Sequence, residues 1–164
     1  MQIQVRQFTT NDIEDAISIW NEIVLEANAF PQEECLNRIS GIDFFTSQDY
    51  TGIAYDADTN KIVGLYILHP NNIGRCGHIC NASYAVASNC RGMHIGQALV
   101  CDCMHKAKEL GYRVLQFNAV VATNEPALKL YERLGFTKLG TITGGFRKSD
   151  GSYVDIIPHY ISLV

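Results

Sequence analysis

The spacing of apolar residues changes repeatedly along this chain, and the order of those changes limits the possible folds more than any other feature. Strand-like runs occupy residues 3–8, 51–55, 61–68, 78–86, 113–121, 136–143 and 153–163. Helical spacing occurs at residues 13–24, 32–39, 96–110 and 124–134. The predicted order is β-α-α-β-β-β-α-β-α-β-β, which indicates an α/β or α+β fold with a mixed central sheet flanked by helices.

Local signals for helix ends and turns agree with this order. Asn11 followed by Glu14 predicts a capping box at the start of the first helix. The polar run 56–60 predicts a hairpin, and Gly111 and Gly135 predict helix ends. No linker-like tract divides the 164 residues, so we expect a single domain spanning 1–164.

Charge and cysteine usage exclude several classes of function. The net charge is −4 and no run of basic residues appears, so we expect no nucleic-acid partner. The six cysteines lack the spacing of zinc ligands, which predicts free thiols and no metal site. No segment approaches the roughly 20 apolar residues that span a bilayer, and the first residues lack a signal-peptide pattern. We therefore expect no membrane association and a cytoplasmic location.

The segment from Arg91 to Gly96 has the properties of an anion-binding turn. It follows a predicted strand, contains two glycines and leads into a predicted helix. The first amides of a helix have no partner within the helix and carry partial positive charge, which stabilises a phosphate group. Arg91 can add a charge-assisted contact. Glycine pairs also occur in ordinary turns, and neither common nucleotide-binding motif is present, so this turn alone leaves both interpretations open.

The turn is similar to the Arg/Gln-x-x-Gly-x-Gly/Ala signature of the GNAT superfamily of acyl-CoA N-acyltransferases, in which loop amides bind the CoA pyrophosphate. The sequence departs from the signature at His94, where the family usually has its first glycine. A residue with a side chain is expected there to have an ordinary negative φ and to leave less room for the phosphate. We expect the His94 amide to bind phosphate, with the imidazole either touching a phosphate oxygen or lying on the surface.

A second segment, 124–136, is similar to the GNAT pattern N-x-x-A-x-x-x-Y-x-x-x-G-F. Asn124 and Tyr131 are almost two helical turns apart and therefore share one face of the predicted helix. The resemblance, which covers about the C-terminal half of the chain, implies that Asn124 bonds the pantetheine arm and that Tyr131 protonates the CoA thiolate. Without it, Asn124 is equally well an N-cap and Tyr131 a core aromatic. The cofactor-binding residues that the resemblance implies for acetyl-CoA are Tyr84, Ala85, Val86, Arg91, Gly92, Met93, His94, Ile95, Gly96, Gln97, Asn124, Ala127 and Tyr131.

The resemblance implies direct acyl transfer to an amine, with a backbone amide of residues 84–86 near the developing oxyanion. Many relatives carry a glutamate base on the strand before the phosphate turn, where this chain has Asn81, which can orient a water but cannot accept a proton. The further candidates for the base are His78, Glu26, Glu33 and His159. A covalent acyl-cysteine route through Cys90 lacks a partnering His and Asp.

The acceptor is less constrained by the sequence. Arg147 or Asp155, in a predicted hairpin, could read a charged acceptor, while Phe30, Phe44, Phe45 and Tyr50 are either cleft or core residues. A loose similarity to phosphinothricin-type acetyltransferases favours a small-molecule primary amine. An acidic cleft formed by Glu33, Glu34 and Asp43 would instead favour basic peptides, and His94 together with Asn81 leaves open a non-catalytic acyl-CoA-binding module. Because relatives are often dimers, a homodimer is also compatible with the resemblance.

Overall fold

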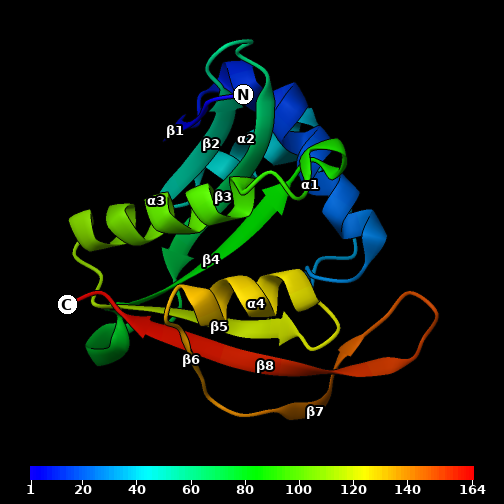
Figure 1. The fold of residues 1–164 in the computed structure, drawn as a ribbon, viewed down its shortest axis with the longest axis vertical. Helices are drawn as coiled ribbons and strands as arrows, with labels where there is room; N and C mark the ends of the chain where they lie inside the picture. Colours follow the sequence, from blue (N-terminus) through cyan, green and yellow to red (C-terminus); the bar gives the residue numbers. More distant parts are fainter.

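A mixed eight-stranded sheet forms the centre of the computed structural model, which describes residues 1–164 (Figure 1). Its strands are ordered β1-β2-β3-β4-β5-β8-β6, and β7 also pairs with β8. The α/β prediction is therefore confirmed. The strands are β1 (Ile3–Gln7), β2 (Tyr50–Asp56), β3 (Ile62–Pro70), β4 (Ile79–Val86), β5 (Val114–Val121), β6 (Thr137–Lys138), β7 (Ile142–Arg147) and β8 (Tyr153–Ser162).

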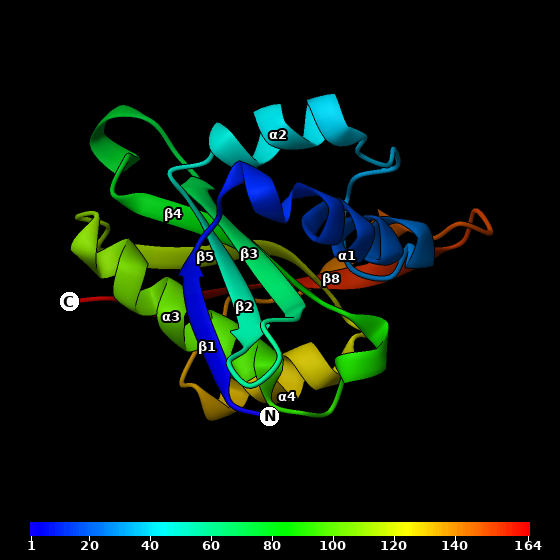
Figure 2. The same cartoon turned by 90° about the horizontal axis from the view of Figure 1, so that it is seen from above.

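Helices cover both faces of the sheet. Seen from above, α1 (Ile13–Glu26) and α2 (Arg38–Thr46) lie on one side, and α3 (Ile95–Glu109) and α4 (Glu125–Arg133) lie on the other (Figure 2). Short 3₁₀ turns occupy Thr10–Asp12, Gly74–Cys76 and Ser88–Cys90. The core between these layers is apolar and continuous, with Trp20, Leu65 and Leu99 fully buried. None of the helices combines the length and the hydropathy that crossing a lipid bilayer requires.

The strands β4 and β5 are the only parallel neighbours, and they separate almost at once. Ladder pairing is limited to Ile79 with Val114 and Cys80 with Leu115. Beyond this joint the two strands diverge, as Figure 1 shows. The remaining length of β4 therefore keeps its antiparallel pairing with β3 but has no strand along its other edge.

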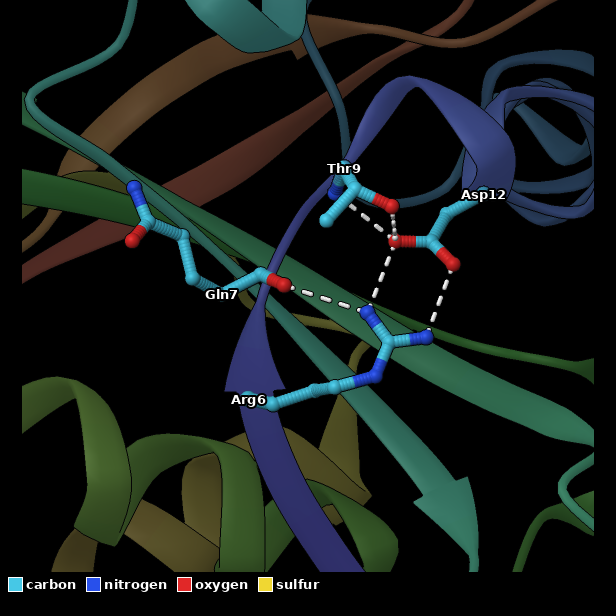
Figure 3. Close-up of polar contacts among 4 residues, drawn as sticks. All are labelled: Arg6, Gln7, Thr9 and Asp12. Atoms are coloured by element: carbon cyan, nitrogen blue, oxygen red, sulfur yellow. Dashed lines mark hydrogen bonds and ion pairs between the residues drawn. The ribbon is translucent and has the colours of Figure 1, made fainter.

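The turn from β1 into α1 is fixed by a clamp between Arg6 and Asp12 (Figure 3). The Arg6 guanidinium donates to both carboxylate oxygens of Asp12 at 2.8 Å, and the Thr9 amide donates to the same carboxylate. Thr9 and Asp12 form the capping box at this turn, so the predicted pairing of Asn11 with Glu14 is wrong. The true cap lies two residues earlier because a 3₁₀ turn precedes the α-helix, which shifts the first free amides toward the N-terminus.

Two predicted elements also differ from the structure. The second helix begins at Arg38, capped by the Asn37 side chain, rather than at Gln32. Asn21 holds the chain before it in an irregular path by bonding both backbone groups of Leu36. The predicted strand 136–143 is divided into β6 and β7, since Gly140 has a φ of 130° that interrupts an extended strand.

Candidate functional site

The open edge of β4 presents unpaired backbone groups. The backbone hydrogen bonds between β3 and β4 are made by the odd-numbered residues of β4. At one end the Asn71 amide donates to the Ile79 carbonyl, and just past the other end the Ala87 amide donates to the Val63 carbonyl. In an antiparallel pair the alternate residues direct their backbone groups away from the partner strand. The amides and carbonyls of Ala82, Tyr84 and Val86 therefore point to the open edge.

A cleft of about 960 Å³ lies along this edge, between β4, β5, α3 and α4. It brings together most of the residues singled out by the two motifs, although they come from four separate elements. The predicted site residues that line it are Asn81, Tyr84, Val86, Arg91, Gly92, His94, Ile95, Gly96, Gln97, Asn124, Ala127 and Tyr131.

Two of the predicted residues do not line the cleft. Ala85 is fully buried, and its position on β4 directs its backbone groups into the ladder with β3. Met93 is in the phosphate turn, but its side chain is exposed on the outside of the cleft.

The turn before α3 forms a row of free donors. None of the amides from Arg91 to Gln97 donates to an acceptor within the chain; the first bonded amide of the helix is that of Ala98, which donates to the His94 carbonyl. Such a row at the positive end of a 15-residue helix is suited to a pyrophosphate, whose oxygens accept several hydrogen bonds at once. This geometry fits the cofactor that the family resemblance implies.

His94 has a left-handed backbone, with a φ of 61° and a ψ of 16°. The prediction of an ordinary negative φ is therefore wrong. The turn needs a left-handed residue where the family has glycine, and histidine is among the side chains that tolerate this region better than most. Gly92 also has a positive φ, of 78°. The two left-handed residues form a tight turn whose amides are left without partners in the chain.

Arg91 is held at the cleft by Glu26, the last residue of α1, at 2.5 Å. Glu22, one helical turn earlier, accepts from the Ser88 amide, so α1 contacts the connection between β4 and α3 at two points. Glu26 is the only carboxylate that lines the cleft, whereas Arg91, Arg133 and Lys148 are cationic. The cleft therefore has an excess of positive charge.

Tyr131 lies on the α4 side of the cleft. Its ring packs on Phe117, with centroids 4.6 Å apart, and on His159, with centroids 5.7 Å apart. Burial raises the pKa of the phenol above its ordinary value, so the hydroxyl is protonated at neutral pH. The hydroxyl makes no hydrogen bond within the chain and is not fully enclosed, so it is free to donate into the cleft.

Asn124 serves as the N-cap of α4 and also faces the cleft. Its side-chain oxygen accepts from the Ala127 amide at 3.4 Å. The Asn124 side-chain NH₂ makes no hydrogen bond within the chain. The cap therefore fixes the orientation of the amide and leaves its donor available to a ligand, so the structural and the binding interpretations are both compatible with the geometry.

The four further candidates for the general base differ in whether they line the cleft. Glu26 lines the cleft but is paired with Arg91, and Glu33 is paired with Arg147 outside the cleft lining. His78 is exposed and absent from the lining. His159 is fully buried behind Tyr131, where burial lowers its pKa, and its Nε2 has no partner.

The structure distinguishes between the alternatives that the sequence left open on the acceptor side. Glu33, Glu34 and Asp43 do not line the cleft, so they form no acidic cleft. Glu33 and Glu34 lie in the α1–α2 connection, where Glu33 pairs with Arg147, and Asp43 lies on the exposed face of α2. Of the four aromatic candidates only Phe30 lines the cleft: Phe44 and Phe45 pack around Trp20, and Tyr50 stacks on Tyr66. Asp155 accepts from the Gly144 amide and is also absent from the lining.

Several cleft residues were not identified from the sequence, among them Asn118 and Lys148. Asn118 lies on β5, and Lys148 extends from the β7–β8 hairpin into the lining. Asn118 is one of two polar residues in a mainly apolar strand, which was an available signal. Lys148 carried no signal, since a lysine in a hairpin is ordinarily solvated.

The chain is similar in sequence to two proteins that are named as an acetyltransferase or a putative one. It is 38% identical over 96 residues to N-acetyltransferase aca1 of Schizosaccharomyces pombe, a match that covers 58% of this chain and 46% of aca1. The chain thus spans about half the length of that relative. It is 26% identical over 148 residues to the putative phosphinothricin acetyltransferase YwnH of Bacillus subtilis, which covers 88% of this chain and 90% of YwnH.

Solved structures agree over the whole fold. A GCN5-related N-acetyltransferase from Kribbella flavida superposes with a TM-score of 0.89 at 30% identity and covers 98% of this chain and 97% of its own. A phosphinothricin acetyltransferase from Sinorhizobium meliloti, solved in complex with AcCoA, has a TM-score of 0.89 at 18% identity, with 99% and 89% covered. The family model described as Acetyltransferase (GNAT) family matches residues 17–136. The chain therefore belongs to the GNAT family, whose members are acyl-CoA-dependent N-acetyltransferases.

Proposed function

We propose that this protein transfers an acetyl group from acetyl-CoA directly to the primary amine of a small molecule. The observation that carries the proposal is the arrangement along one cleft of three features: the free amides from Arg91 to Gln97, the open edge of β4, and the unbonded hydroxyl of Tyr131. These features match, in that order, a pyrophosphate, an extended amide-containing arm and a thioester sulfur.

The chain's own groups then have defined roles. The amides of Tyr84 and Val86 are placed to stabilise the oxyanion that forms when the amine attacks the thioester carbonyl. Tyr131 donates its proton to the departing sulfur. Burial raises the pKa of the phenol and so keeps Tyr131 protonated, and the same burial would raise the pKa of the departing thiol. Alignment of the amine with the thioester supplies most of the remaining rate acceleration over the uncatalysed reaction.

The size of the acceptor is limited by the walls of the cleft. Asn28 to Pro31 and Lys148 line it from two different segments, and Glu33 and Arg147 of these segments form an ion pair. The contact between the two segments narrows the part of the cleft in which the acceptor amine would bind. No unpaired carboxylate is available there for a basic peptide, because Glu26 is bound to Arg91. These points favour a small molecule over a protein acceptor.

The test is steady-state release of CoA thiol with a panel of small amines and peptides, for the wild type and for Tyr131→Phe. The expected result is turnover with small amines and a fall in kcat of about 10²-fold or more in the variant, with unchanged acetyl-CoA affinity measured by calorimetry. Unchanged turnover in Tyr131→Phe would exclude the acid role. Turnover with peptides alone would favour a protein acceptor, and acetyl-CoA binding without turnover on any amine would indicate a binding module.

A further inference from the structure

Three asparagines meet where β4 and β5 separate. Asn81 comes directly after the last residue of β4 that pairs with β5, and Asn118 lies further along β5; both line the cleft. Asn71, at the end of β3, joins them: its Oδ1 accepts from Asn81 Nδ2 at 3.2 Å and from Asn118 Nδ2 at 2.6 Å. We refer to Asn71, Asn81 and Asn118 as the asparagine cluster.

The hydrogen bonds of the cluster set the direction of each amide. Asn118 Oδ1 accepts from Gln116 at 3.0 Å, and Asn71 Nδ2 donates to Asn72 at 2.7 Å. Asn81 is different, because its Nδ2 is bonded to Asn71 while its Oδ1 accepts no hydrogen bond within the chain. Asn81 therefore offers the cleft a fixed carbonyl oxygen, which accepts an N–H but does not remove a proton at neutral pH.

The charged groups around the cleft disfavour an ammonium ion. The only carboxylate in the lining is Glu26, which Arg91 neutralises, and the only imidazole is His94, in the phosphate turn. The remaining charged residues of the lining, Arg133 and Lys148, are cationic. The other titratable groups there are the Cys90 thiol and the phenols of Tyr84 and Tyr131, both of which are protonated because burial raises their pKa values.

We infer that the asparagine cluster is the binding site for the reacting amine and that it selects weakly basic amines, with a pKa near or below that of an α-amino group. This inference rests on the proposed acetyl transfer. The amine binds already neutral and donates one N–H to Asn81 Oδ1, which directs its lone pair toward the thioester. A C–N bond forms and the C–S bond breaks; the sulfur takes a proton from Tyr131, the proton lost by nitrogen passes to water, and Tyr131 regains a proton from water.

The size of the selection follows from the fraction of each amine that is neutral. An α-amino group has a pKa of about 7.7–8.0 and a lysine side chain about 10.4, so at pH 7.5 the neutral fractions differ by about 200-fold. A more basic amine is intrinsically more nucleophilic, which offsets part of this difference. An enzyme with a carboxylate base partly removes the selection, because the base takes the proton from the bound ammonium ion.

Asn71 acts in this arrangement as a positioning residue, since it lies outside the cleft lining and reaches the amine only through Asn81. Replacement by leucine removes the acceptor that two side chains share. The expected effect is a 5- to 10-fold rise in KM for the amine, with KM for acetyl-CoA unchanged. Ile73→Ala is the matched control on the same loop, because the Ile73 side chain is 91% exposed and makes none of the hydrogen bonds of the cluster.

The decisive experiment uses lysinamide, which carries an α-amine and an ε-amine in one molecule, with product regiochemistry read by NMR. The expected result for the wild type at pH 7.5 is at least 10-fold more α-product, with the ratio falling as the pH rises to 10. Asn81→Glu, which installs a base, is expected to reduce the ratio and to move the acid limb of the pH profile to lower pH; Asn81→Asp repeats the test if the longer side chain destabilises the fold.

Equal or ε-selective acetylation by the wild type, or an unchanged ratio in folded Asn81→Glu, would overturn the inference and leave acetyl transfer standing. No acetylation of either nitrogen, nor of any amine in the wider panel, would contradict the proposed function itself.

Discussion

The guanidinium of Arg91 lies 2.5 Å from the carboxylate of Glu26, so the arginine of the phosphate turn is bonded to a side chain from α1. This ion pair keeps Arg91 beside the free amides of the turn. It also places a negative charge close to the position where a pyrophosphate would bind. Glu26 therefore both orients the arginine and competes with the ligand for it.

Replacing Glu26 by glutamine is expected to tighten acetyl-CoA binding. The Arg91 side chain is 48% exposed, so solvent screens the pair and its strength is about 0.2–1 kcal/mol. The expected fall in Kd is about 1.5- to 5-fold, larger at low salt, measured by calorimetry at two ionic strengths. Glu33→Gln is the control, since it breaks a similar exposed pair with Arg147 outside the cleft lining. Weaker binding in Glu26→Gln would show that orientation of Arg91 outweighs the competition.

Gly96→Asp is expected to separate stability from binding. A Cβ at this position meets Leu130 Cδ2 at 3.6 Å, which is an ordinary contact, and a carboxylate in the first turn of a helix is favourable. The melting temperature should therefore not fall. The same carboxylate lies among the free amides of the turn, and acetyl-CoA affinity should drop by about 100-fold or more through like-charge repulsion. Gly96→Ala is the control, and equal affinities of the two variants would contradict a pyrophosphate site here.

The left-handed backbone of His94 predicts a graded response to substitution. This conformation costs a residue with a side chain about 1–2 kcal/mol, whereas glycine adopts it freely but adds about 0.5–1 kcal/mol of chain entropy to the unfolded state. His94→Gly should therefore change the free energy of unfolding by no more than about 1 kcal/mol. His94→Val, which is β-branched, should be less stable than His94→Gly by about 1–2 kcal/mol in urea unfolding. Equal stability of the two variants would argue against the left-handed conformation.

The clamp between Arg6 and Asp12 predicts an acid-sensitive contribution to stability. Burial alone would raise the pKa of Asp12, but the bonds from Arg6 and Thr9 outweigh it and lower the pKa below its ordinary value. A lowered pKa in the folded state stabilises the protein fully above the unfolded pKa, about 3.9, and the gain is lost as the pH falls through the folded value.

Asp12→Asn should therefore reduce the free energy of unfolding at pH 7 by about 1–2 kcal/mol, since Arg6 is 42% exposed and partly screened. The measurement is urea unfolding of both proteins between pH 7 and pH 2.5. The difference between them should remain constant down to about pH 5 and then shrink. A constant difference at all pH values would show that the carboxylate charge contributes nothing.

The order of elements was predictable because it depends on local periodicity and on turn residues. The hairpin between β2 and β3 and the starts of α3 and α4 follow directly from such signals. The start of α2 was not predictable, because Asn21 holds residues before it through bonds to Leu36, 15 positions away. A contact of that range leaves no trace in a local pattern.

The site was predictable where a motif describes a short stretch of backbone, as from Arg91 to Gly96. The conformation of His94 was not, because the ordinary preference of a side chain gave the wrong sign for φ, while the turn required the left-handed form. The asparagine cluster also could not be found, since Asn71, Asn81 and Asn118 come from three segments that only the sheet topology brings together.

The brief pairing of β4 with β5 makes the sheet two half-sheets joined at one corner. One half carries the phosphate turn and the other carries Tyr131. If acetyl-CoA binds as proposed, its arm along the open edge of β4 would take the place of a strand and brace the two halves against each other. Affinity for acetyl-CoA and stiffness of the sheet are then coupled, and a substitution at the joint, at Cys80 or Leu115, would alter both without touching the ligand.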